Sequence, residues 1–99
     1  MKVLLSTLMH NTPELSENMY KQWTSDKYVD NCEIMILDNG STVNIPHATH
    51  RLDENLFFGG GCNVIMNYFL EGSYDYLVLF NSDIVYHSYN FLENCFKEI

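Results

Sequence analysis

Short polar residues stand at the ends of three apolar stretches of this sequence, and their side chains are of types that hydrogen-bond ligands and coordinate hard metal ions. They are Thr7, His10 and Asn11 at the first end, Asp38, Asn39, Gly40 and Ser41 at the second, and Asn81, Ser82 and Asp83 at the third. If the stretches are neighbouring parallel strands, these residues meet at the carboxyl edge of one sheet, where open α/β sheets bind ligands. The pattern therefore predicts a cleft at that edge.

Two of these groups indicate a particular chemistry. A carboxylate at Asp38 can accept hydrogen bonds from the N–H of a base or from ribose hydroxyls. Asn81 and Asp83 form an Asn-x-Asp pair whose oxygens suit Mg²⁺ or Mn²⁺, and such an ion can bridge the two phosphates of a nucleotide. Each group also has a purely structural interpretation: Asp38 capping its own turn, and a strand-to-helix turn at 81–83. Taken alone, each group favours its structural interpretation.

The run Gly59-Gly60-Gly61 matches neither of the two common phosphate-binding glycine motifs. It lacks the spacing of GxGxxG and both the spacing and the lysine of GxxxxGK[ST]. We therefore predict that these glycines allow a helix to pack closely on the sheet. His47 and His50 have no Cys or His pair at zinc spacing to complete a site, so we interpret both as loop residues.

Apolar runs predict three buried strands. These runs are Val3 to Met9, Cys32 to Leu37 and Tyr76 to Phe80. Nearly continuous apolar runs are typical of parallel strands covered on both faces. The weakly patterned segment 42–51 is expected to hold a short edge strand within Ile45 to Thr49, because proline is tolerated at a sheet edge.

Helices are predicted between the strands. Thr12 and Pro13 mark the start of the first helix, and its apolar face recurs every four residues at Leu15, Met19 and Trp23. A second helix is predicted from Cys62, with Gly72 as its C′ residue, and a third after a Ser88 cap, carrying Phe91, Leu92, Cys95 and Phe96. The order predicts an α/β fold with one domain, residues 1–99: a three-layer, open, mostly parallel sheet with helices on both faces.

Composition excludes several classes of function. Five Lys+Arg against thirteen Asp+Glu give a net charge of −8, whereas nucleic-acid binding needs a basic patch. We therefore expect neither nucleic acid nor an anionic membrane as a partner. No apolar run reaches the length of a transmembrane segment. Three cysteines without CxxC spacing argue against a disulfide framework and favour a reducing, cytoplasmic location.

Four stretches, taken in order, carry a family resemblance: Val3–Asn11, Ile34–Thr42, Glu54–Asn63 and Tyr76–Asp83. They are similar to a first strand ending near an Asn, a strand followed by Asp-Asn-Gly-Ser, an Asn–aromatic–Gly-rich–Asn helix, and the Asn-Pro-Asp version of a DxD motif. Together they resemble the N-terminal half of family 2 glycosyltransferases of the GT-A fold, as in rhamnosyltransferase-like members. The resemblance covers essentially the whole chain and implies a truncated GT-A (nucleotide-diphospho-sugar transferase) fold.

The resemblance implies a nucleotide site with named residues. Thr7 and Asn11 would border the nucleobase and ribose. Asp38 would hydrogen-bond a uracil or thymine ring, and Ser41 would lie nearby. The implied ligand is a UDP- or dTDP-linked sugar.

The resemblance also implies a metal site. Asp83 would bind Mg²⁺ or Mn²⁺, and Asn81 would be oriented toward the ribose or a metal-bound water. The sequence departs from the family pattern at both motifs: Asn81 replaces the first acid of DxD, and Val43 stands where a further Asp usually follows Ser-Thr.

The chain ends about one helix after the metal motif, so the family's acceptor half, with the base of inverting enzymes, has no counterpart in it. Two hypotheses follow: a glycosyltransferase completed by an acceptor-side partner or further sequence, and a non-catalytic nucleotide-sugar-binding module. A receiver-like or flavodoxin-like signalling module ranks last, because the first strand ends without an acid and no lysine stands directly after the third strand. An uncovered sheet edge favours self-association, so we also expect a homo-oligomer.

Overall fold

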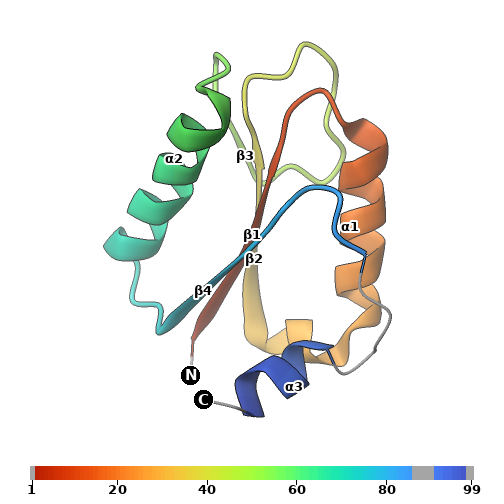
Figure 1. Cartoon of the computed structure of the whole chain (residues 1–99), viewed down its shortest axis with the longest axis vertical. Coiled ribbons are helices and arrows are strands. Elements are labelled where there is room, and N and C mark those ends of the chain that lie inside the picture. Colours follow the sequence, from red (N-terminus) through yellow and green to blue (C-terminus); the bar gives the residue numbers. More distant parts are fainter. Residues whose placement is uncertain (1, 86–90, 98–99) are drawn as a thin grey trace.

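A four-stranded parallel sheet forms the centre of the molecule (Figure 1). The computed structural model describes residues 2–85 and 91–97. Its elements are β1 (Val3–Met9), α1 (Pro13–Ser25), the 3-10 helix η1 (Lys27–Asn31), β2 (Cys32–Asp38), β3 (His50–Arg51), α2 (Phe57–Glu71), β4 (Tyr76–Phe80) and α3 (Phe91–Lys97). The strand order is β3-β2-β1-β4, and every pair is parallel. The predicted open α/β sheet is confirmed.

The long strands follow the apolar runs. β1 and β4 have the predicted bounds, and β2 continues one residue further, to Asp38. The edge strand was predicted wrongly within Ile45 to Thr49, since β3 occupies His50–Arg51. Pro46 has no N–H to donate, and His47 has a φ of 63°. This part of the segment therefore does not continue as a strand.

The helices begin and end near the predicted positions, with two differences. α1 starts at Pro13, but the Thr12 hydroxyl makes no capping bond. α2 starts at Phe57, earlier than the predicted Cys62. Gly72 follows α2 as expected, although its backbone is extended (φ −85°, ψ 173°) and not left-handed. The predicted Ser88 cap lies outside the described residues.

Each face of the sheet packs against its own helices. The cluster on the α1 face includes Met19 and Trp23, both fully buried, and Leu92 of α3. The cluster on the other face joins β1 and β2 to Ile65 of α2. Figure 1 shows α1 and α2 on opposite sides of the strands. The three layers hold the carboxyl ends of β1, β2 and β4 at one edge.

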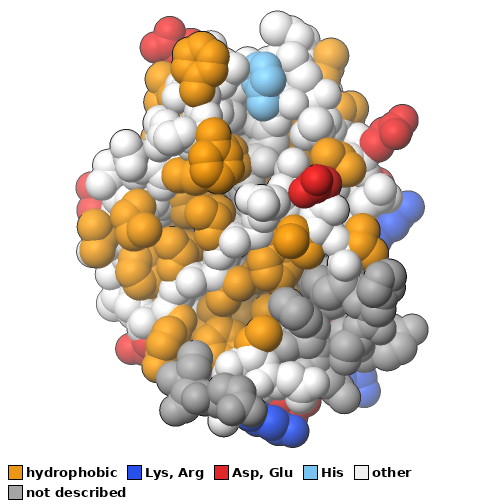
Figure 2. Space-filling model, viewed as in Figure 1, with side chains coloured by type: hydrophobic (Ala, Val, Ile, Leu, Met, Phe, Trp, Pro, Cys, Tyr) orange, Lys and Arg blue, Asp and Glu red, His pale blue; other side chains and the backbone are white. Residues whose placement is uncertain are grey.

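Some large apolar side chains remain exposed outside these clusters. Figure 2 shows hydrophobic side chains gathered on the face that carries α2 and β4. Met66 and Leu70 of α2 and Leu79 of β4 are among the exposed large apolar residues. Among the described residues, no helix is both long enough and apolar enough to cross a bilayer.

Candidate functional site

The strand order reverses between β1 and β4, and this reversal marks the candidate site. From β1 the chain moves outward to β2 and β3, and it then returns to place β4 on the other side of β1. In open α/β sheets, ligands bind outside the carboxyl ends of the strands at such a switch point. Residues just beyond the ends of β1 and β4 are therefore the first candidates for ligand contact.

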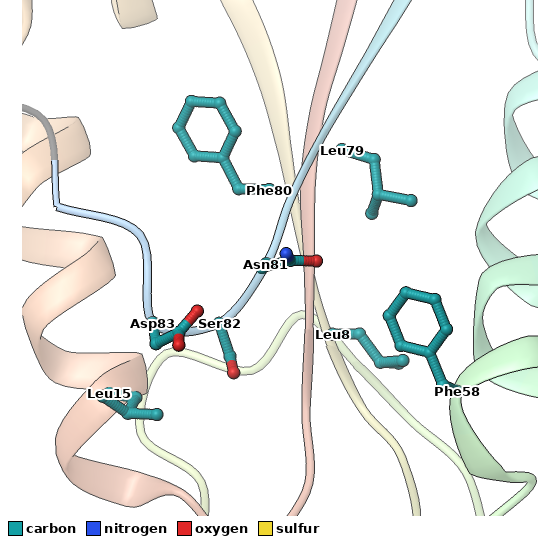
Figure 3. Close-up of a pocket in the computed structure, with 8 residues that line it drawn as sticks. All are labelled: Leu8, Leu15, Phe58, Leu79, Phe80, Asn81, Ser82 and Asp83. Carbon is teal, nitrogen blue, oxygen red and sulfur yellow. The ribbon is translucent and has the colours of Figure 1, made fainter.

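Two adjacent hollows lie at this switch point. The first, of about 300 Å³ and here named the β4 hollow, is lined by Asn81, Ser82 and Asp83 after β4, with Leu15 of α1 and Phe58 of α2 (Figure 3). The second, of about 290 Å³ and here named the β1 hollow, is lined by residues that include His10, Asn39, Asn55 and Phe57. Both hollows share Leu8, Phe58 and Ser82. They are therefore neighbouring parts of one depression.

Asn81 and Asp83 occupy the turn at the end of β4. The Ile84 N–H donates to the Asn81 carbonyl at 3.2 Å, which closes this turn. In Figure 3, Asn81 points across the end of β1 toward α2, whereas Asp83 lies on the α1 side near Leu15. Both side chains are exposed. The turn thus offers an amide and a carboxylate to the β4 hollow.

Asn11, Asp38 and Ser41 form one hydrogen-bonded network at the ends of β1 and β2. The Ser41 N–H donates to Asp38 Oδ1 at 2.9 Å, and the Ser41 hydroxyl accepts the Asn11 N–H at 2.9 Å. Asn11 Oδ1 in turn accepts the Thr42 N–H at 2.8 Å. Asn11 has a φ of 52°, which asparagine adopts more readily than most residues. The network fixes the two loops against each other.

The Asp38 carboxylate is mostly committed to protein partners. It is 4% exposed, and its second oxygen accepts Arg51 Nη1 at 3.4 Å. The turn-capping interpretation of Asp38 is therefore what the structure shows. A carboxylate has about four acceptor positions, so acceptor capacity remains for a ligand. Asp38 is not among the residues that line the two hollows.

Thr7 lies beneath the site and holds two strands together. Its side chain is fully buried, and its hydroxyl donates to the Phe80 carbonyl at 2.9 Å. It lines neither hollow. The structure thus brings all six predicted site residues to one edge, but in two groups on either side of β1. The flanking strands β2 and β4 are two inter-strand spacings apart, roughly 10 Å.

Asn39 holds the loops of the candidate site together, although the sequence did not identify it as a site residue. Only 2% of it is exposed. Its Nδ2 donates to the Phe57 carbonyl at 2.9 Å, its Oδ1 accepts the Leu56 N–H at 3.0 Å, and its carbonyl accepts His10 Nδ1 at 2.9 Å. The Asn39-Gly40 turn therefore positions the start of α2. Phe57 and Phe58 were missed as lining residues because the second helix was predicted to begin only at Cys62, whereas α2 begins at Phe57.

Two glycines make this junction possible. Gly40 has a φ of 64°, and a Cβ on it would lie 2.1 Å from the backbone of Glu54. A Cβ on Gly61 would lie 2.7 Å from Leu8 Cδ1. The predicted close packing of helix on sheet is confirmed at Gly61. Gly59, by contrast, faces open space.

The side chains at the end of β4 supply only part of the ligands that a metal ion needs. In residues 2–85 and 91–97, no three His, Cys, Asp or Glu side chains group together as a metal site. Asp83 supplies one carboxylate, beside the Asn81 amide. Mg²⁺ is commonly held by one or two carboxylates together with substrate phosphates and water. These residues therefore suit a metal ion whose other ligands come from a bound diphosphate.

The remaining histidines take structural positions. His47 stacks on Tyr20, with ring centroids 3.7 Å apart, and its Nε2 donates to Glu17 at 2.8 Å. His50 meets the Tyr68 ring edge-on, with centroids 4.9 Å apart. His47 lies in the loop before β3, as expected, whereas His50 is the first residue of β3, so its interpretation as a loop residue was wrong.

Cys32 and Glu33 have perturbed pKa values and lie away from the switch point. Burial, together with nearby Asp26, raises the pKa of Cys32 from its ordinary value of 9.0 to about 11. Hydrogen bonds from Tyr74 and Tyr68 lower the pKa of Glu33 despite some opposing desolvation. Glu33 stands near the start of β2, at the opposite end of the sheet from the two hollows. These shifts therefore do not identify an acid or base for the candidate site.

Comparison with protein-family models gave no match, and comparison with curated protein sequences gave none either.

Proposed function

We propose that this chain binds a nucleotide-diphospho-sugar, UDP- or dTDP-linked, and serves as the donor-binding part of a family 2-like glycosyltransferase with a GT-A fold. The observation that carries this proposal is the reversal of strand order. It brings the Asn11–Asp38–Ser41 network to the same sheet edge as the turn at 81–83. The turn lines the β4 hollow, whereas the network lies beside the two hollows and lines neither. The resemblance of the same stretches to that family agrees with this arrangement.

The two groups of residues would hold the two ends of the nucleotide. The base and ribose would lie near Asn11, Asp38 and Ser41, with Thr7 supporting the strand beneath. The diphosphate would lie at Asn81 and Asp83. The chain has only five Lys and Arg residues for thirteen Asp and Glu, so its side chains provide little charge to balance a diphosphate. Mg²⁺ or Mn²⁺ held by Asp83 would supply that balance and stabilise a departing diphosphate.

One observation favours a second candidate, a nucleotide-sugar-binding module without catalysis. Among the described residues that line the two hollows, Asp83 is the one carboxylate, and it is assigned to the metal ion. His10 is also engaged, because its Nδ1 donates to Asn39 and its Nε2 accepts Asn11 Nδ2 at 3.3 Å. The described residues lining the two hollows therefore offer no separate general base for an acceptor hydroxyl.

A cytoplasmic location stays part of the proposal, supported by three free cysteines.

Calorimetric titration tests the binding step. We expect UDP or dTDP to bind in the presence of Mn²⁺ or Mg²⁺, and chelation to weaken that binding. Asp83→Asn should abolish the metal-dependent part, whereas Asp30→Asn, at an exposed carboxylate near the opposite end of the sheet, should leave it unchanged. If neither nucleotide binds with metal present, the proposal is wrong. Sugar transfer to an acceptor panel by the chain alone would exclude the non-catalytic module.

A further inference from the structure

Two phenylalanines at the start of α2 are unusually exposed. Phe57 is 76% exposed and Phe58 is 65% exposed. Neither belongs to the core clusters on the two faces of the sheet. Both line the β1 hollow, and Phe58 also lines the β4 hollow. Figure 3 shows the Phe58 ring beside Leu8, on the α2 side of the end of β1. These rings therefore contribute to the hollows more than to the core.

The backbone holds Phe57 in a costly conformation. Its φ is 61°, in the left-handed region where a bulky residue is an outlier. Two asparagines maintain this geometry: Asn39 Nδ2 donates to the Phe57 carbonyl at 2.9 Å, and Asn55 Oδ1 accepts the Phe57 N–H at 2.8 Å. Strain of this kind persists where surrounding structure enforces it, and it concentrates at ligand-binding sites.

The hydrogen-bonding groups around the β1 hollow are largely used within the protein. Both ends of the Asn39 amide bind the backbone of α2, and Asn55 Oδ1 is also bonded. His10 uses both ring nitrogens. A ligand in this hollow would therefore meet aromatic surface more than free polar groups. Stacking of a flat ring is the contact that such a surface provides.

We propose that Phe57 and Phe58 form the stacking surface for the pyrimidine base of the bound nucleotide. This inference rests on the proposed function. The β1 hollow lies between the loops held by Asn39 and the turn at 81–83. A nucleotide whose diphosphate reaches Asn81 and Asp83 therefore places its base and ribose in that hollow. The faces of the ring would contact phenylalanine while its edge points toward the Asp38–Ser41 turn.

Binding of UMP, UDP and UDP-glucose to the whole chain, with Mn²⁺ present, tests this assignment. Phe57→Ala and Phe58→Ala should each weaken binding of all three ligands by a similar factor, about 5- to 150-fold. Phe58→Trp should retain binding, because it keeps an aromatic face. Leu70→Ala is the matched control: Leu70 is 68% exposed on the same helix and lines neither hollow. Far-UV circular dichroism confirms that each variant is folded.

The possible outcomes separate the two proposals. If wild-type protein binds none of the three ligands, the proposed function fails and the stacking assignment fails with it. If nucleotides bind but both alanine variants match Leu70→Ala, only the stacking assignment is overturned. A loss confined to UDP-glucose would also overturn it, because the rings would then contact the sugar. Upfield NMR shifts of the H5 and H6 protons of bound UMP, lost in the alanine variants, would support it directly.

Discussion

At the scale of single residues, the left-handed conformation of Phe57 predicts that glycine at this position gives a more stable protein than alanine. This is the reverse of the usual order in a helix. Glycine normally destabilises a helix relative to alanine, but a left-handed conformation costs a non-glycine residue about 1–2 kcal/mol. Phe57→Gly and Phe57→Ala remove the same exposed ring, and only glycine relieves the strain at a φ of 61°. We expect the glycine variant to be more stable by about 0.5–1 kcal/mol in urea unfolding. Equal stability, or a more stable alanine variant, would contradict the strained geometry.

Asn39 connects the turn after β2 to the start of α2, and its removal should be costly. Asn39→Ala leaves the Leu56 N–H and the Phe57 carbonyl without their partner at a 2%-exposed position. Both lost hydrogen bonds are part-buried, and a hydrogen bond contributes about 0.5–1.5 kcal/mol, so we expect a loss of about 1–3 kcal/mol in chemical unfolding. Asn31→Ala, at an exposed asparagine in η1, should change stability by less than about 0.5 kcal/mol.

Cys32 predicts a pH-dependent difference in thiol reactivity. Burial and Asp26 raise its pKa from 9.0 to about 11, and the thiolate is the reactive form. Because the pKa is raised in the folded state, the neutral thiol contributes stability below pH 9 that is lost as the pH rises toward 11. In variants that each keep a single cysteine, iodoacetamide should modify the exposed Cys95 faster than Cys32 at pH 8. Equal rates in the folded protein would mean that Cys32 is not protected by burial.

At the scale of elements, the packing of α2 on the sheet predicts opposite effects at two glycines of that helix. Gly59 faces open space, so Gly59→Ala should stabilise the protein by up to about 1 kcal/mol through helix propensity. A Cβ on Gly61 would lie 2.7 Å from Leu8 and 3.1 Å from Asn39 Nδ2. Overpacking of this kind costs about 1–3 kcal/mol, so Gly61→Ala should be the less stable variant. Thermal unfolding of both variants decides between these effects.

The elements also show which parts of the fold could be predicted from the sequence pattern alone. β1 was predicted with correct bounds because its apolar run is buried on both faces of the sheet. β4 was also predicted with correct bounds, although most of its residues are only half-buried and Leu79 is exposed. The start of α2 was missed because Asn39, distant in sequence, holds the backbone of Leu56 and Phe57. The same error hid the aromatic side of the candidate site. The carboxyl-edge residues were found because strand ends are readable locally, whereas the partners that engage Asp38 depend on tertiary contacts.

At the scale of the whole molecule, the expected homo-oligomer remains a prediction, and its physical basis can be stated. β4 is a terminal strand of the sheet in the part of the chain that the structure describes, and Leu79 of β4 is exposed, as are Met66 and Leu70 of α2. Apolar surface beside an uncovered edge favours association. A net charge of −8 opposes it. Salt screens repulsion between exposed charges beyond about 10 Å at 0.1 M ionic strength.

Static light scattering at increasing salt therefore tests this balance. We expect the average mass to rise with ionic strength and with protein concentration. Leu79→Lys places a charge on the outer strand, where lysine discourages edge pairing, and should keep the chain monomeric. Val43→Lys, at a 47%-exposed residue in the loop between β2 and β3, adds the same charge outside α2 and β4 and should not. Monomeric wild-type protein at high concentration and high salt would show that the apolar face does not bind a second copy.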